Sequence, residues 1–267
     1  MTEENKNIRL AILKMISESG AAHVASALSA VEMISAVFKS VDLEKIKNGD
    51  NGRDRVVLSK GHGTAALYAV MQARGLLTAE EISTYAKNGS LLQGHASHRV
   101  PHVEHSTGSL GHGASAALGM AIGLSSRKFS VRAFVVTGDA ELQEGSSWEA
   151  FMLAGQLKLN NYCVLVDNNG ISQMGEFANW CDVQPIGNKF KSFRFDIVEV
   201  KDGNNEEEIL SAISHLGKKE APLAVICHTT KGKGISFMES NAVWHYRTPK
   251  GEDYDKAVAE LKETKIQ

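Results

Sequence analysis

The sequence has 267 residues, of which 43% are hydrophobic and 22% charged, a composition typical of a globular protein with ample chain for a buried core. The 29 basic and 31 acidic side chains nearly balance, which argues against general binding to nucleic acid or to anionic membranes. Three cysteines argue against a disulfide scaffold and favour a reducing, cytoplasmic location, and no apolar run suggests a signal peptide or a membrane span.

Apolar periodicity predicts an alternation of helices and strands. In chain order, the predicted elements are helix 5–18, helix 29–39, strand 55–59, helix 64–74, helix 78–88, helix 114–125, strand 131–137, helix 145–157, strand 162–167, strand 195–200, helix 205–217, strand 223–228 and helix 252–264. Two of the helix starts rest on capping-box patterns, Ser29 with Glu32 and Thr78 with Glu81. Continuous apolar strands alternating with helices predict an α/β fold, a parallel sheet sandwiched by helices, and we expect one domain over residues 1–267.

Residues 89–113 form a long segment with little periodicity, rich in glycine and histidine. Such a segment inside a compact domain is usually functional or disordered, and its composition favours function. Four histidines lie close together here: His95, His98, His102 and His105. A zinc site is an alternative, although neither cysteine nor an obvious set of carboxylates accompanies them.

Polar residues follow two of the predicted buried strands. Asp139 comes directly after strand 131–137, and Asn169 after strand 162–167. If these strands are parallel neighbours, both side chains lie at the same edge of the sheet, where oxygen ligands suit Mg²⁺ or Ca²⁺. The helix that starts near Gly145 also directs its N-terminus at this edge, which favours an anion. On spacing alone, an N-cap at Asp139 and a plain turn at Asn169 fit equally well.

Several segments resemble one enzyme family. Gly138-Asp139-Ala140, followed by Asn168-Asn169, resembles the signature of thiamine diphosphate enzymes. Five segments in the same order are similar to the N-terminal, diphosphate-binding half of transketolase: residues 59–69, 107–123, 138–150, 167–175 and 231–239. The resemblance runs from about His23 to His245 and is closest to the separately encoded N-terminal subunits of split transketolases.

The resemblance implies a thiamine diphosphate-binding fold and a set of site residues. The Asp139 and Asn169 side chains and the Ile171 carbonyl would hold Mg²⁺ (or Ca²⁺). Contacts to the cofactor are implied for His62, Gly108, Ser109, Leu110, Gly138, Asp139, Ala140, Glu144, Asn169, Ile171 and His245. Donors of hydrogen bonds and carriers of protons in the substrate channel are implied to be His23, His62, His95 and His245.

The resemblance also implies an activity. A two-carbon ketol unit would pass from a ketose, expected to be phosphorylated, to an aldose acceptor. The acid that activates the cofactor would come from a C-terminal transketolase subunit with the pyrimidine-binding domain, in an expected α2β2 assembly in the cytoplasm. The alternatives are a subunit of another thiamine diphosphate enzyme, similar to deoxyxylulose-phosphate synthase or a dehydrogenase E1, and a non-catalytic homologue.

Two features of the motifs bear on binding. Ala140 stands where the family has the second glycine of Gly-Asp-Gly, so we expect weaker cofactor binding, through crowding by the β-carbon or through strain if φ is positive. The segment Lys231-Gly-Lys233-Gly234 lacks the spacing of a nucleotide-binding loop, and its lysines are expected to be solvated.

Overall fold

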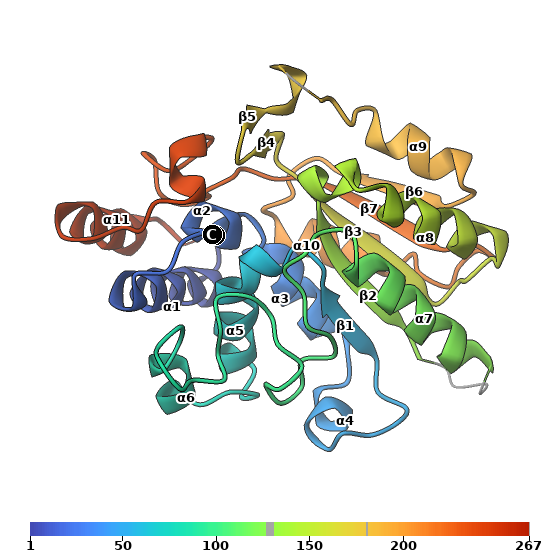
Figure 1. Ribbon diagram of the computed structural model, residues 1–267, viewed down its shortest axis with the longest axis horizontal. Coiled ribbons are helices and arrows are strands. Elements are labelled where there is room, and N and C mark those ends of the chain that lie inside the picture. Colours follow the sequence, from blue (N-terminus) through green and yellow to red (C-terminus); the bar gives the residue numbers. More distant parts are fainter. Residues whose placement is uncertain (127–130, 180, 267) are drawn as a thin grey trace.

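The computed structural model describes residues 1–126, 131–179 and 181–266. Its centre is a parallel five-stranded sheet with the strand order β1-β2-β3-β7-β6 (Figure 1). The strands are β1 (Arg55–Leu58), β2 (Ala133–Gly138), β3 (Tyr162–Asn168), β6 (Asp196–Val200) and β7 (Leu223–His228). In the central pair, Gly138 of β2 lies opposite Asp167 of β3, so both strands end at the same edge. The predicted class, a parallel sheet sandwiched by helices, is confirmed.

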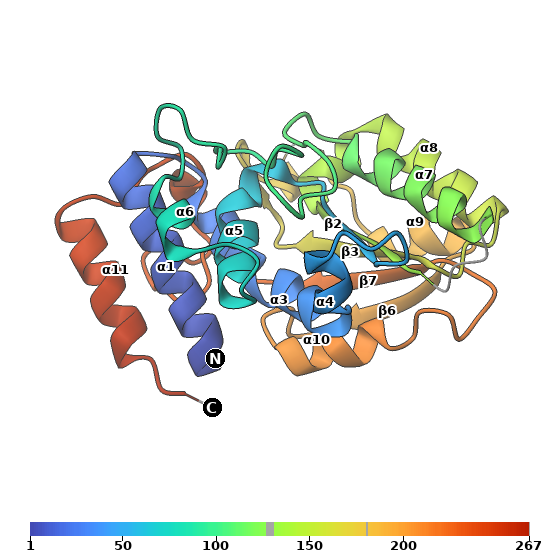
Figure 2. The same ribbon diagram turned by 90° about the horizontal axis from the view of Figure 1, so that it is seen from below.

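Helices cover both faces of the sheet (Figures 1 and 2). On one side lie α7 (Gly113–Ser126), α8 (Gly145–Gln156) and α9 (Ile186–Ser192). On the other side lie α1 (Glu3–Ser19), α2 (Val24–Ser29), α3 (Val31–Ser40), α4 (Leu43–Lys47), α5 (Thr64–Ala73), α6 (Ala79–Ser83), α10 (Glu206–Ile213) and α11 (Glu252–Glu263). Helices α1 and α11 pack together at the outer end of this second group. None of the helices in the described parts of the chain is both long and apolar enough to cross a membrane.

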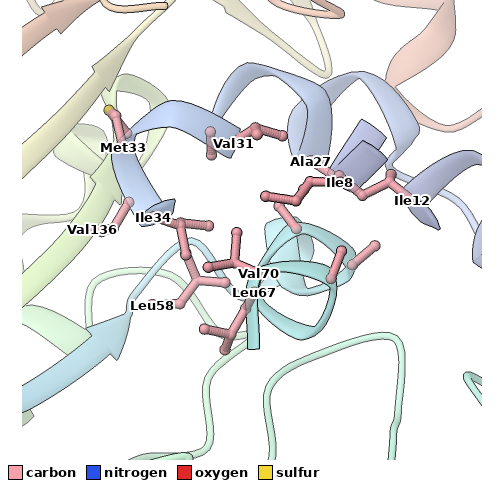
Figure 3. Packing of buried hydrophobic residues seen from close by; sticks show 14 of the residues in the cluster. Ile8, Ile12, Ala27, Val31, Met33, Ile34, Leu58, Leu67, Val70 and Val136 are labelled. Carbon is pink, nitrogen blue, oxygen red and sulfur yellow. The ribbon is translucent and has the colours of Figure 1, made fainter. Parts of the chain in front are cut away.

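Successive side chains of each strand pack alternately into two hydrophobic cores, one on each face of the sheet. Leu58 and Val136 point into the core shared with α1, α2, α3 and α5, as Figure 3 shows. Their strand neighbours Val57 and Val135 point into the core beneath α7, α8 and α9. Burial of one such side chain contributes about 1.5–3 kcal/mol to folding, so both faces of the sheet are strongly fixed.

The helix start predicted at Ser29 is wrong. Helix α2 ends at Ser29 and α3 begins at Val31. The Ser29 hydroxyl donates to the Asp167 carboxylate at 2.7 Å and does not accept a backbone N–H of α3, and Glu32 forms a buried ion pair with Arg9. Both side chains of the apparent capping box therefore bind residues that are distant in the sequence.

The second capping box, Thr78 with Glu81, is confirmed by reciprocal hydrogen bonds. Its helix ends at Ser83 rather than near residue 88, and Ala86 has the positive φ of 51° that ends helical geometry. The sequence patterns missed the short helices α4 and α9 and a small hairpin, β4 (Ile171–Ser172) with β5 (Gly175–Glu176). Between α6 and α7 the chain has no helix or strand, as predicted for most of residues 89–113.

Candidate active site

A cavity of about 290 Å³ opens at the carboxyl ends of β1, β2, β3 and β7. Each of these strands continues into a loop or a short helix that supplies side chains to the wall, as is usual for parallel sheets. Nearly all the site residues predicted from the sequence line it: His23, His62, His95, Gly108, Leu110, Gly138, Asp139, Ala140, Glu144, Asn169, Ile171 and His245. Geometry therefore gathers residues that lie more than 200 positions apart in the chain.

Ser109 is the exception among these residues, and its contact with the cofactor stays a prediction. Its side chain is exposed, whereas Gly108 and Leu110 line the cavity.

The predicted metal ligands lie around one turn. The Asp139 carboxylate accepts the Gly170 N–H at 2.6 Å and the Ala140 N–H at 2.8 Å, which ties the end of β2 to the turn after β3. Asn169 Oδ1 accepts the Ile171 N–H at 3.1 Å. Asp139, Asn169 and Ile171 therefore line the same cavity at the ends of β2 and β3. Their binding of a metal stays a prediction.

This set of oxygen donors fits a divalent cation. Asp139 is only 2% exposed, and burial, with the nearby charge of Asp167, raises the pKa of its carboxyl group to about 7. A cation beside Asp139 would offset the cost of burying this charge, and hard oxygen ligands suit Mg²⁺ or Ca²⁺. Across residues 1–126, 131–179 and 181–266, no group of three or more His, Cys, Asp or Glu side chains is placed to hold a metal, so the zinc alternative has no support.

Ala140 lies in η2 (Asp139–Gln143), the turn that follows β2. Its φ is not positive, so the expectation of backbone strain is wrong. Crowding by its β-carbon stays a prediction. Helix α8 begins directly after η2, and Glu144, the residue at its N-cap, also lines the cavity.

The four predicted histidines form one cluster in the cavity. The ring of His23 lies 5.5 Å from that of His62, 5.7 Å from that of His95 and 5.3 Å from that of His245, measured between centroids. The backbone of His23 adopts the left-handed conformation with φ of 71°, and its N–H donates to the His245 carbonyl at 3.0 Å. A non-glycine residue held in this conformation is common at functional sites, where the surroundings offset about 1–3 kcal/mol of strain.

Burial keeps His23, His62 and His245 neutral at pH 7. It lowers the pKa of His23 to about 4, with a further contribution from His95. It lowers the pKa of His245 to about 3, aided by the charge of Lys231, and it brings the pKa of His62 well below its usual value. A neutral imidazole has one donor and one acceptor nitrogen, so each ring can both give and accept a hydrogen bond from a substrate hydroxyl.

Two buried lysines in the cavity wall were not predicted. Lys60 forms an ion pair with Asp167, and both side chains are almost fully buried. Lys231 is 2% exposed, which makes its predicted solvation wrong, and its ammonium donates to the Ile171 carbonyl at 2.7 Å and contacts His245 Nδ1 at 2.9 Å. Burial and the charge of Lys60 lower the pKa of Lys231 to about 8.

These lysines make the cavity suited to an anion. Lys231 follows β7 at the same sheet edge as Asp139, so a rule that examines every strand end would have selected it from the sequence. Nothing in the local sequence marks Lys60 as buried, because its partner Asp167 lies 107 residues away.

Comparison with known proteins places this geometry in context. Residues 2–263 match the family described as transketolase, thiamine diphosphate binding domain. An apulose-4-phosphate transketolase subunit of Phocaeicola vulgatus is 34% identical over 267 residues, covering 98% of this chain and 93% of that protein. The 6-deoxy-6-sulfo-D-fructose transketolase subunit SqwG of a Clostridium species is 34% identical and covers 95% of this chain and 93% of that protein.

Longer relatives match over part of their length. Human transketolase is 34% identical over 240 residues, which cover 89% of this chain but 38% of that protein. The crystal structure of transketolase from Campylobacter jejuni superimposes with a TM-score of 0.89 at 27% identity, covering 97% of this chain and 42% of that one. A mutant transketolase from Pichia stipitis gives 0.88 at 29% identity, with 97% and 40% covered.

Proposed function

The chain belongs to the transketolase family, as a thiamine diphosphate-binding domain, and from this premise we propose that it is the N-terminal subunit of a two-chain transketolase. Its reaction is the transfer of a two-carbon ketol unit from a phosphorylated ketose to an aldose. The observation that carries this proposal is the convergence of the Asp139 and Asn169 turns with four histidines in one cavity. Two relatives of nearly equal length, both named transketolase subunits, support the two-chain form. A single domain over residues 1–267 and a cytoplasmic location remain part of the proposal.

Different residues of this chain would bind the metal, the diphosphate and the ring of the cofactor. Asp139, Asn169 and the Ile171 carbonyl would hold Mg²⁺, and the metal with Lys231 would neutralise the cofactor diphosphate. Gly108 and Leu110 would frame the cofactor ring. When bound, thiamine diphosphate supplies the chemistry that breaks and forms the carbon–carbon bond next to the ketone.

The histidines act on the substrate. His23, His62, His95 and His245 would donate hydrogen bonds to sugar hydroxyls and carry protons to and from them. Burial lowers the pKa values of His23, His62 and His245 and keeps these rings neutral, so they contact sugar hydroxyls without adding positive charge. Lys231, in contact with His245 Nδ1, would fix the orientation of that ring.

An apolar surface beside the cavity supports the need for a partner. Helix α7 contains no charged residue, yet it lies on the outside of the sheet next to α8. Met152 of α8 and Leu157, the residue at its C-cap, are 56% and 47% exposed. A helix that is apolar all round is normally buried, so we propose that this surface, formed by α7 and α8, is covered in the assembly.

The proposed occupant is the C-terminal transketolase subunit with the pyrimidine-binding domain. This chain covers about 40% of the solved transketolases, and the two-chain proposal assigns part of the matching remainder to that partner. The surface adjoins Glu144, which lines the cavity at the start of α8, so a chain seated there would also close the site. We propose an α2β2 assembly.

A substitution on the surface tests the docking proposal. Met152→Glu places a charge at an exposed site of α8 and should abolish co-purification with the partner, while the circular dichroism spectrum of the chain stays unchanged. Ile266→Glu, at an exposed residue (54% exposed) that follows α11 on the other side of the sheet, is the matched control and should retain the partner. Retention of the partner by the Met152 variant would contradict the docking surface.

Substrate assays separate the proposal from its alternatives. The chain, co-purified with its captured partner, should cleave a ketose phosphate and transfer the ketol unit to an aldehyde when thiamine diphosphate and Mg²⁺ are present. Decarboxylation of pyruvate in place of ketose cleavage would favour a synthase or dehydrogenase of the same cofactor class. Failure of the complex to bind the cofactor would favour a non-catalytic homologue.

A further inference from the structure

One buried carboxylate beside the cavity has no part in the binding scheme above. Glu141 is 1% exposed and lies in η2, two residues after Asp139. Its carboxylate accepts three hydrogen bonds, from the Ser59 hydroxyl at 2.5 Å, the Gly111 N–H at 2.8 Å and the Thr137 hydroxyl at 2.6 Å. The three donors come from three different segments of the chain.

Hydrogen bonds alone hold this carboxylate. Within the described ranges of the chain, no lysine, arginine or histidine forms an ion pair with Glu141, in contrast to the buried pair of Lys60 and Asp167. A buried carboxylate is costly unless it is fully hydrogen-bonded, and removing it would leave the Gly111 N–H without its acceptor.

The three donors belong to three walls of the cavity. Ser59 directly follows β1 and leads to Lys60 and His62. Thr137 lies in β2, directly before the turn that carries Asp139. Gly111 ends the loop 107–111, whose Gly108 and Leu110 line the cavity. Glu141 therefore joins the metal-binding turn to the loop expected to frame the cofactor ring.

The segments around Glu141 pack with almost no free space. A β-carbon on Gly61 would lie 2.7 Å from the Gly108 nitrogen, and one on Gly111 would lie 2.5 Å from the Ser146 hydroxyl. Thr107 adds a hydrogen bond to the Leu58 carbonyl at 2.7 Å. Because there is no room here even for an added β-carbon, a small displacement of the loop requires a displacement of the chain after β1 as well.

We infer that Glu141 is a positioning residue that fixes the loop 107–111 against the Asp139 turn, so that the ring and diphosphate ends of the cofactor are held at a set separation. The inference rests on the proposed function. It assigns Glu141 no contact with cofactor or substrate. Its effect is on cofactor affinity, transmitted through Gly111 and the η2 turn.

The chain contains a natural reporter of this turn. The indole N–H of Trp148 donates to the Leu142 carbonyl at 2.6 Å, one residue after Glu141. Intrinsic fluorescence can therefore follow titration of the chain, in complex with its captured partner, with thiamine diphosphate in excess Mg²⁺. Urea unfolding of each variant, measured in parallel, separates loss of affinity from loss of stability.

Two substitutions at the same position give opposite expectations. Glu141→Ala leaves the donors without an acceptor and should raise the Kd for thiamine diphosphate at least about tenfold. Glu141→Gln should restore the Kd to within about threefold, because its oxygen accepts from Gly111 and Ser59 while its amide donates to the Thr137 hydroxyl. If Glu141 contributed to stability alone, the Kd for thiamine diphosphate would be unchanged in each variant that folds.

A second buried carboxylate is the matched control. Glu32 is 2% exposed, is paired with Arg9 and lies outside the cavity wall, so Glu32→Gln should lower stability and leave the Kd unchanged. If Glu141→Ala does not fold, the isosteric Thr137→Val, which removes one of the three bonds, should raise the Kd about two- to fivefold.

Several outcomes would overturn the inference. A Kd for folded Glu141→Ala within twofold of the unaltered chain would do so, and so would a Glu141→Gln variant as weak as Glu141→Ala. If the Glu141→Ala variant does not fold, an unchanged Kd for Thr137→Val would also overturn the inference. A complex of the unaltered chain with its partner that binds no thiamine diphosphate would overturn the proposed function together with this inference.

Discussion

Lys60 and Asp167 form the buried ion pair beneath the cavity, and Lys60→Met tests how much it contributes. Methionine keeps most of the side-chain volume and removes the ammonium. The pair is 2% and 0% exposed, and Asp167 would then keep only the hydroxyl donors Ser29 and Thr229. The perturbation is therefore a single buried charge left without its counter-ion.

The expected loss is large relative to total stability. Breaking a buried pair by removing one partner costs about 3–5 kcal/mol, against a usual total of about 5–15 kcal/mol. Burial alone would raise the pKa of Asp167, and the charge and hydrogen bond of Lys60 are the main reasons that this pKa is lowered instead. In Lys60→Met the folded-state pKa should rise above the unfolded value, so the deficit should be greatest at neutral pH and shrink as Asp167 is protonated at lower pH.

Urea unfolding at pH 7.5 and pH 5 measures both effects. Lys60→Met/Asp167→Asn, which removes both charges, should recover at least about half of the loss at pH 7.5. A single variant that loses less than about 1 kcal/mol, or a double variant no more stable than the single one, would refute the assignment of Lys60 as the essential counter-ion.

Three further predictions concern binding and pH. Lys231→Met should raise the Kd for thiamine diphosphate at least about tenfold. Because burial lowers the pKa of Lys231 to about 8, the affinity of the unaltered chain for the cofactor should fall between pH 7 and 9. Calorimetry should find no such fall for the Lys231→Met variant. Burial lowers the pKa of His23 to about 4 and of His245 to about 3, so the unfolded chain binds protons below about pH 6.5 that the folded chain does not, and stability should decline as pH falls from 6.5 to 4.5. Urea unfolding of His23→Asn and His245→Asn should show a smaller decline; an equal decline would contradict the assignment. Ala140→Gly should tighten thiamine diphosphate binding about threefold in Mg²⁺ by relieving the β-carbon, and equal affinities would exclude crowding.

The sheet and the position of the site could be predicted because both follow from local patterns. Residues 133–138 and 162–168 are apolar runs of the length that strands buried on both faces require. The carboxyl ends of neighbouring parallel strands must then meet, so Asp139 and Asn169 could be placed together without knowledge of the rest of the fold.

The errors arise where contacts distant in the sequence override a local pattern. Ser29 and Glu32 have the spacing of a capping box, but Asp167 and Arg9 bind them more strongly than the helix end would. Lys231 could have been selected because it follows a predicted strand, but its burial has no local sign, since segments distant in the sequence form the cavity around it. To predict these contacts, one must know that β3 and β7 are neighbours in the sheet, and the sequence pattern does not provide this strand order.

The most direct test of the two-chain account compares ketol transfer by this chain alone, by its captured partner alone and by the two mixed, each with thiamine diphosphate, Mg²⁺, a ketose phosphate and an aldose acceptor. We expect activity in the mixture only, saturating at equal amounts of the two chains. Turnover by this chain alone would contradict the account, as would a mixture without activity that nevertheless contains the bound cofactor.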